Sequence, residues 1–293
     1  MSTIASSIRA EVLIEALPYI QKFRGQTFVI KYGGSAMEDE HLVERLLRDV
    51  VFLEAVGINP VLVHGGGKSI SQKMRDAGLP ARFVNGLRIT DSATIGLVEE
   101  VLDREINPGL VRAINEFGGR AVGFSGRDVC LAEKLPPQLD AANGETVDLG
   151  YVGTVTSLQL ETVRAIIAEE KVPVISPIAR NAEGHTLNVN ADISAGSIAA
   201  ALGASKMIYL SDVPGIMRDV KNRDSLIPSV NSASVQQLID HDVIVGGMIP
   251  KVESALRALA AGVGKVHFID GRIPHALLLE ICTNSGIGTE VLP

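Results

Sequence analysis

Short β-branched runs alternate with amphipathic helical segments along most of this chain. Thr27–Tyr32 and Asn59–His64 are typical of buried strands, as are Lys206–Leu210 and Lys265–Ile269. Between the first two, Asp39–Val56 places apolar residues three and four positions apart, the spacing of an amphipathic helix. This alternation predicts an α/β fold: a three-layer α/β/α sandwich around a mostly parallel central sheet.

Three other stretches refine this prediction. Asp91–Phe117 is expected to form one or two helices around Pro108. Between Val129 and Thr156, polar segments with Gly and Pro separate short strand-like runs, which indicates hairpins. The polar residues 180–187 follow a buried strand and are the candidate boundary between two lobes.

Composition excludes several classes of protein. The 293 residues include 27 Lys and Arg against 34 Asp and Glu, a net charge of −7 that is unfavourable for nucleic-acid binding. Its two cysteines, Cys130 and Cys282, have neither the spacing of a metal site nor the number for a disulfide framework. The chain starts with a polar and then amphipathic segment and has no transmembrane-length apolar run. We therefore expect a cytoplasmic protein without membrane contacts.

Glycine clusters lie beside three of the expected elements. Gly33-Gly34 and Gly65-Gly66-Gly67 follow strands, and Gly246-Gly247 precede a helix. Ligands of open α/β sheets bind beyond the carboxyl ends of the strands, where glycine lets backbone N–H groups approach an anion. The clusters predict a cleft for phosphate or carboxylate groups, although each alone could be a tight turn.

Two familiar phosphate-binding motifs are absent. The segment HGGGKS ends like a P-loop, but the first glycine of that motif is replaced by Leu62. No G-x-G-x-x-G occurs, which argues against a dinucleotide-binding dehydrogenase. HExxH, EF-hand and zinc-finger patterns are also absent, so no metal ligands are predicted.

Charged and polar residues accompany the glycine clusters. Lys31 lies at the carboxyl end of an apolar strand, Lys251 lies near the start of a helix, and Asp192 lies where a small-residue helix begins. Each has an ordinary structural alternative: an edge lysine, a solvated helix residue and an N-cap. Arg88 and Asn188 could likewise be a surface ion-pair residue and a turn residue. Together they suit phosphoryl transfer, in which cations and backbone donors face developing negative charge.

The motifs KYGG, VHGGGK, NGLRIT, LNVNAD, LSDVPGI and GGMIPKV occur in this order, from about Thr27 to the C-terminus. In this order they resemble the amino-acid kinase superfamily, and most closely its acetylglutamate kinase family. The resemblance implies one kinase domain over residues 25–293, with a substrate lobe to about residue 180 and an ATP lobe from about 181. It also implies phosphorylation of the γ-carboxylate of N-acetyl-L-glutamate by ATP with Mg²⁺, in L-arginine biosynthesis.

Residue roles follow from the same resemblance. Lys31, Lys251 and Asp192 would be catalytic. The substrate would be bound by Gly65, Gly66, Arg88 and Asn188, and ATP by Gly33, Gly34, Ser211, Asp212 and Gly215.

A regulatory site is expected from the ends of the chain. Ile8–Ile20 is amphipathic, although it could simply pack on its own subunit. Arginine-inhibited members of the family carry such a helix, here residues 1–24, which links dimers into a hexamer. The resemblance implies L-arginine as effector, with Tyr19, His267, Glu280 and Gly286 around it and Lys221 as a weaker candidate. Some members also bind a PII-type signalling protein, and no residue of this sequence decides whether this chain does.

Two alternatives remain open. The chain could be another amino-acid kinase, such as glutamate 5-kinase, although NGLRIT and the lack of an appended RNA-binding domain argue against it. It could instead be a non-catalytic amino-acid or nucleotide sensor on the same fold. Retention of both lysines and Asp192 favours an enzyme.

Overall fold

The computed structural model describes residues 6–37, 39–283 and 286–293. An eight-stranded sheet runs through it, and β15 and β16 are its antiparallel neighbours, whereas the other paired strands are parallel. Across the sheet the order is β14 (Ser229–Asn231), β16 (Thr289–Leu292), β15 (Lys265–Asp270), β13 (Lys206–Ser211), β1 (Thr27–Tyr32), β2 (Asn59–His64), β10 (Val172–Ile175) and β5 (Ala121–Phe124). The predicted mostly parallel sheet is confirmed.

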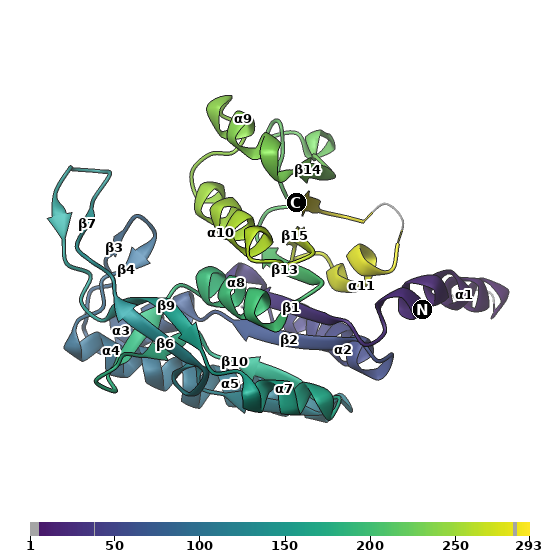
Figure 1. Ribbon diagram of the computed structural model, residues 1–293, viewed down its shortest axis with the longest axis horizontal. Helices are drawn as coiled ribbons and strands as arrows, with labels where there is room; N and C mark the ends of the chain where they lie inside the picture. The colour runs from purple at the N-terminus through teal and green to yellow at the C-terminus, as the bar shows by residue number, and fades with distance from the viewer. Residues whose placement is uncertain (1–5, 38, 284–285) are drawn as a thin grey trace.

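Helices cover both faces of this sheet (Figure 1). One face packs on α2 (Glu40–Ala55), α5 (Asn107–Glu116) and α11 (Ala276–Ile281), the other on α8 (Ala191–Leu202) and α10 (Met248–Ala260). Along β1, Phe28 and Ile30 enter the core with α2, whereas Val29 enters the core with α8. Since successive strand side chains alternate between faces, Lys31 points to the α8 side.

The predicted hairpin region forms part of a small barrel. Its strands are β6 (Cys130–Lys134), β9 (Val152–Leu158), β11 (Ile178–Arg180) and β12 (Thr186–Val189), and β6 pairs antiparallel to β9. Two hairpins project from the same end of the molecule (Figure 1): β3 (Phe83–Val84) with β4 (Leu87–Arg88), and β7 (Gln138–Leu139) with β8 (Thr146–Val147). The hairpin prediction is therefore confirmed.

The region around Pro108 stays helical throughout. It consists of α4 (Ser92–Glu99), the π-helical segment η2 (Glu100–Ile106) and α5. The remaining helices are α3 (Gly67–Asp76), α6 (Gly126–Val129), α7 (Glu161–Ala168) and α9 (Val235–Asp240), with 3₁₀ turns η1 (Gly34–Met37), η3 (Arg223–Ser225) and η4 (Ser232–Ser234).

Both ends of the chain hold informative elements. The N-terminal helix α1 (Ser6–Phe23) extends away from the rest of the molecule (Figure 1), and residues 1–5 of the expected oligomerisation segment lie outside the described residues. The predicted final helix Pro274–Cys282 is shorter than expected, and the unpredicted strand β16 follows it. Within the described residues, no helix has the length and apolar character needed to cross a membrane.

Candidate active site

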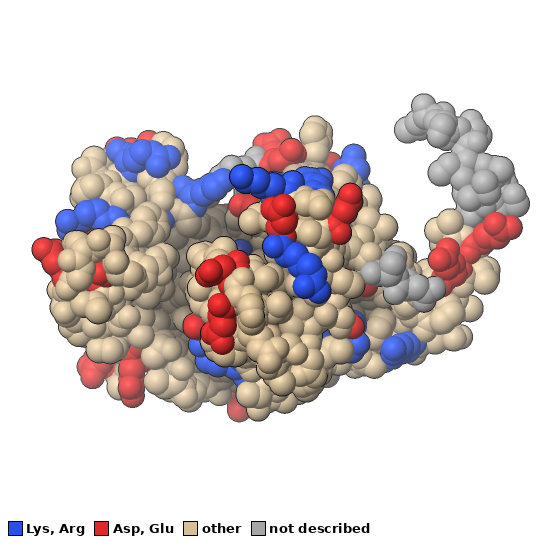
Figure 2. All heavy atoms as spheres, turned by 90° about the horizontal axis from the view of Figure 1, so that it is seen from above, with Lys and Arg blue, Asp and Glu red and all other residues tan. Residues whose placement is uncertain are grey.

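The carboxyl ends of β1 and β2 meet at a cavity of about 210 Å³. Its wall includes residues of the first two glycine clusters, of β1 and β4, and of the segment that enters α8: Lys31, Gly33, Gly34, Gly65, Gly66, Gly67, Arg88, Asn188 and Asp192. Figure 2 shows the molecule hollowed between two masses on this side. Since α3 and α8 also begin at this wall, their N-termini favour an anion in the cavity.

An ion pair crosses the cavity wall. Nζ of Lys31 lies 2.9 Å from Oδ1 of Asp192, and the two side chains are only 12% and 17% exposed. The N-cap expected as an alternative role of Asp192 is filled by Asn190, whose side chain accepts bonds from the N–H groups of Asp192 and Ile193. The carboxylate of Asp192 is therefore directed at Lys31 instead of at its own helix.

The second predicted lysine stands in the first turn of α10. Burial lowers the pKa of Lys251, the charges of Asp192 and Asp212 oppose this shift, and the charge of Lys31 adds to it. Two ammonium groups, Lys31 and Lys251, and two carboxylates, Asp192 and Asp212, thus lie close enough to affect one another's charge. A cation near a helix N-terminus is unfavourable for the helix, so local stability does not explain Lys251.

Close packing explains why glycine occupies the strand ends. Gly34 has a φ of +79°, and a Cβ there would lie 2.6 Å from Oδ1 of Asp212. The N–H of Gly65 donates to the carbonyl of Tyr32 over 2.6 Å. A Cβ on Gly66 would lie 2.5 Å from a methyl group of Leu102. A side chain at Gly34 or Gly66 would therefore collide with Asp212 or Leu102.

Arg88 is buried and held on several sides. One Nη donates to the carbonyl of Gly67 at 2.6 Å and to Oγ of Ser71 at 2.7 Å, and the guanidinium stacks on Phe83 at 4.6 Å. Burial lowers the pKa of Arg88 from its ordinary value. Nearby, Asn188 donates to Oγ1 of Thr90 at 3.2 Å. The structure therefore brings Arg88 and Asn188 to the same cavity as Lys31 and Asp192.

A second, more apolar cavity adjoins Lys251. Gly215 lines it, together with the apolar residues Val213, Ile216, Met217, Val220, Val243, Val245 and Met248. Ser211 is buried at the end of β13, where its hydroxyl bonds the backbone of Val213, and Asp212 lies against Gly34. Of the residues predicted for ATP, Gly33 and Gly34 thus face the first cavity and Gly215 the second.

Within the described residues, acidic and imidazole groups do not gather into a metal site. Across the described part of the chain, no three or more His, Cys, Asp or Glu residues are grouped so that they could hold a metal ion.

The chain is similar to known proteins over nearly its full length. Residues 26–270 match the model of the amino acid kinase family. An acetylglutamate kinase of Akkermansia muciniphila is 49% identical over 285 residues, covering 97% of this chain and 95% of the relative. An acetylglutamate kinase of Desulfitobacterium hafniense is 50% identical, covering 96% of both chains. The chain belongs to the acetylglutamate kinase family.

A solved structure agrees with this family's fold. The N-acetylglutamate synthase of Neisseria gonorrhoeae, complexed with coenzyme A and N-acetyl-glutamate, superposes with a TM-score of 0.85 at 25% identity. The match covers 97% of this chain and 63% of the synthase. This chain therefore shares the fold of the part of the synthase that it matches.

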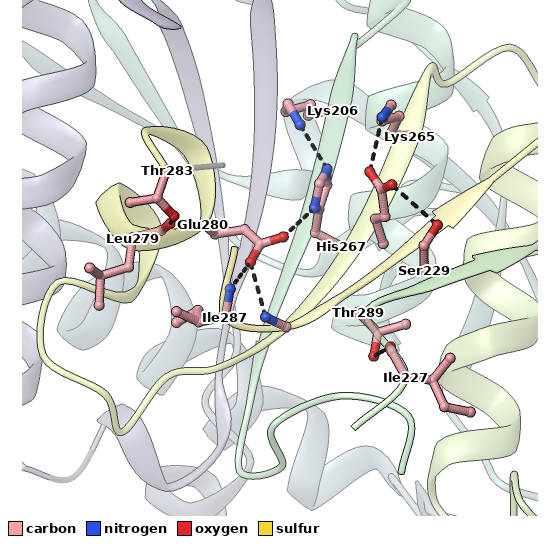
Figure 3. Close-up of polar contacts among 12 residues, drawn as sticks. Lys206, Ile227, Ser229, Lys265, His267, Leu279, Glu280, Thr283, Ile287 and Thr289 are labelled. Carbon is pink, nitrogen blue, oxygen red and sulfur yellow. Dashed lines mark hydrogen bonds and ion pairs between the residues drawn. The ribbon is translucent and has the colours of Figure 1, made fainter. Parts of the chain in front are cut away.

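A third cavity of this family member lies between α1, α11 and the β15 side of the sheet. Tyr19, His267, Glu280 and Gly286, the four residues predicted for arginine, all line it, together with Lys22 and Lys206. Figure 3 shows Glu280 reaching from α11 to His267, which stands between Glu280 and Lys206. Lys221 lies elsewhere, in the exposed segment after β13.

Hydrogen bonds define the charges in this third cavity. Nδ1 of His267 lies 2.6 Å from Oε1 of Glu280, and Nζ of Lys206 lies 2.8 Å from Nε2 of His267. Oε2 of Glu280 accepts from the N–H groups of Ile287 and Gly288 at 2.7 and 3.0 Å. Burial alone would raise the pKa of Glu280, but these bonds hold it below its ordinary value. Burial lowers the pKa of Lys206 to about 8, and Lys265 adds to that effect.

Sequence reasoning missed two groups of residues at these sites. Phe83, Leu102 and Pro177 line the first cavity, and apolar residues of two separate segments line the second. The only sequence signal for the latter is a scatter of apolar residues in a polar, glycine-containing stretch. His64 and Asn107 carried no decisive signal because they lie 43 positions apart in the chain.

Proposed function

We propose that this protein transfers the γ-phosphoryl group of ATP to the γ-carboxylate of N-acetyl-L-glutamate. The products would be ADP and N-acetyl-L-glutamyl 5-phosphate, a step of L-arginine biosynthesis. Membership of the family supports this, as does the N-acetyl-glutamate bound to the similar synthase. The observation that carries the proposal is the Lys31–Asp192 ion pair in the cavity that also holds Arg88 and Asn188.

The acceptor needs no general base. A glutamate-like carboxyl has a pKa of about 4.3 and is ionised at neutral pH. One of its oxygens would attack the γ-phosphorus while the bond to the β–γ bridging oxygen breaks and its electrons remain on ADP. The main obstacle is repulsion between two anions, which cations and backbone donors reduce.

The predicted catalytic and substrate-binding residues would each have a role in this scheme. Lys31 and Lys251 would balance the charge on the transferred phosphoryl group, and Asp192 would orient Lys31. N–H groups of Gly33 and Gly34 would face the phosphoryl oxygens. Arg88 would hold a carboxylate of the substrate, with Asn188, Gly65 and Gly66 around the remaining polar groups. The apolar second cavity beside Lys251 would receive the adenosine.

Mg²⁺ would enter with ATP, since the phosphates themselves supply its oxygen ligands. When bound, the ion would neutralise phosphate charge.

The test is to trap the acyl phosphate with hydroxylamine. ATP and Mg²⁺ are supplied with N-acetyl-L-glutamate, L-glutamate, L-aspartate or carbamate in parallel. A hydroxamate formed with N-acetyl-L-glutamate alone is the expected result. A signal with L-glutamate would favour glutamate 5-kinase, and no turnover of ATP with any acceptor would favour the sensor.

We also propose feedback inhibition by L-arginine at the third cavity. Its carboxylates suit a guanidinium, and its lysines suit the carboxylate of a free amino acid. The same enzyme would assemble as a hexamer, a trimer of dimers, through α1. Support comes from the exposed apolar side chains of this helix, Val12, Leu13, Ile14 and Leu17. For inhibition, arginine must bind an inactive arrangement more tightly than the active one.

A further inference from the structure

A histidine without a role in the proposed chemistry lies directly before the second glycine cluster. His64 ends β2, is fully buried, and its Nδ1 lies 2.9 Å from the carbonyl oxygen of Gly65. A carbonyl oxygen can only accept, so Nδ1 carries the proton and donates. The other nitrogen, Nε2, is then an acceptor.

Asn107 supplies the donor to that acceptor. Its Nδ2 lies 3.2 Å from Nε2 of His64 and also donates to the carbonyl of Val174 at 2.9 Å. Because Val174 presents a carbonyl, the amide nitrogen and not its oxygen must face this side. The Asn107 amide therefore selects the neutral imidazole with its proton on Nδ1, and burial agrees by lowering the pKa of His64 to about 4.

The π-helical segment η2 explains how Asn107 reaches His64. Buried side chains follow the α-helical spacing from Val98 to Leu102, and the next buried polar residue, Asn107, comes five positions later. The i→i+5 turns of a π-helix restore such a residue to the same face. The same segment presses Leu102 and Ile106 against Gly66.

We infer that Asn107 and His64 are positioning residues that hold the Gly65–Gly66 peptide in one orientation. In a planar trans peptide the C=O and the N–H point in opposite directions. His64 binds the carbonyl of Gly65, so the N–H of Gly66 points away from the imidazole. Gly66 itself lines the first cavity. The reversed peptide would present a carbonyl to an anionic substrate. This inference rests on the proposed function, and the ligand it concerns is a carboxylate of the substrate.

Variants of His64 test the orientation. An asparagine amide can replace the Nδ1 donor, whereas leucine cannot. H64L should raise KM for N-acetyl-L-glutamate about ten- to hundredfold with little change in kcat. In H64N, the KM for N-acetyl-L-glutamate should lie close to the wild-type value. The KM for ATP should stay within about twofold in both. A KM for N-acetyl-L-glutamate equal to wild type in H64L would overturn the inference.

Asn107 offers a matched control on its own helix. N107L should raise the same KM, because it removes the donor to Nε2. Asn115 also lies on α5 and bonds a strand of the same sheet, with its Oδ1 2.7 Å from the N–H of Ala121. N115L should cost comparable stability but leave KM unchanged. Equal effects of N107L and N115L on KM would mean that both act only through folding.

A spectroscopic readout is independent of turnover. In protein labelled with ¹⁵N-histidine, one imidazole should stay neutral down to about pH 5 with its proton on Nδ1, and its signal should be missing in H64N. A proton on Nε2, or titration near pH 6.5, would refute the arrangement even if the enzyme is active. If wild type fails to phosphorylate N-acetyl-L-glutamate, the proposed function fails, and this spectrum still decides the inference.

Discussion

Lys31 Nζ and Asp192 Oδ1 are 2.9 Å apart, although the lysine is the next-to-last residue of β1 and the aspartate the second residue of α8. The pairing is possible because β1 sends its odd-numbered side chains to the face that α8 covers. Asn190 caps α8, so the carboxylate can orient an ammonium group at the mouth of the first cavity.

Loss of either active-site lysine should lower turnover and spare the fold. We expect Lys31→Ala and Lys251→Ala each to reduce kcat about 10²- to 10³-fold, because each removes a cation facing the transferred phosphoryl group. Hydroxamate assays and thermal unfolding together measure this. Lys68→Ala, in the exposed part of the P-loop-like segment, is the control and should remain active. Near-normal kcat in either active-site variant would contradict the assignment.

Arg88→Lys should weaken substrate binding specifically. The guanidinium bonds Gly67 and Ser71 while it stacks on Phe83, and an ammonium cannot keep this geometry and also grip a carboxylate. We expect KM for N-acetyl-L-glutamate to rise about tenfold or more, with the KM for ATP unchanged. Arg82→Lys is the control, because Arg82 is exposed and directly precedes the β3–β4 hairpin that carries Arg88. An equal rise in both KM values would point to a general distortion.

Glu280→Gln should remove sensitivity to arginine. The variant keeps the shape of the side chain but loses the charge that would meet a guanidinium in the third cavity. Because one partner of a buried charged hydrogen bond is removed, the half-inhibiting concentration of arginine should rise at least about thirtyfold. Activity without arginine should be retained, because Glu280 lies outside the first two cavities. Wild-type inhibition would place the effector elsewhere.

Deletion of residues 2–20 should abolish both the hexamer and arginine inhibition. The deletion removes Tyr19 from the third cavity and also the apolar side chains of α1, of which Leu13 and Ile14 are 68% and 67% exposed. Light scattering after size-exclusion chromatography measures the mass, and the hydroxamate assay measures inhibition. Unchanged inhibition in a smaller assembly would separate the two proposals.

The pH dependence of stability should carry a contribution from His64. Its pKa is about 4 in the folded protein, against 6.5 as the ordinary value. Between these values the unfolded chain binds a proton that the folded chain does not. The contribution is therefore fully present above pH 6.5 and is lost as pH falls toward 4, by about 3 kcal/mol at most. Urea unfolding at several pH values should show the stability difference between wild type and H64N changing across this window. A constant difference would argue against a neutral buried imidazole.

Much of this protein is determined by local sequence. The β-branched run Thr27–Tyr32 indicates a buried strand, and the apolar spacing of Asp39–Val56 indicates a helix with one buried side. Both elements form almost as predicted. The motif residues Lys31, Arg88, Asn188 and Asp192 also gather at one cavity as expected. Local pattern was sufficient here because period and glycine position report burial and strand ends directly.

Tertiary structure decided the rest. The strand β16 has only four residues and is held by pairing with β14 and β15. The repeat of apolar residues in its own sequence therefore does not predict it. The contact of Asn107 with His64, the seating of Leu102 on Gly66 and the choice of Asn190 as helix cap also depend on how distant or competing groups finally pack. Sequence periodicity records whether a side chain is buried, whereas the partner it meets is set by which segments the folded chain brings together.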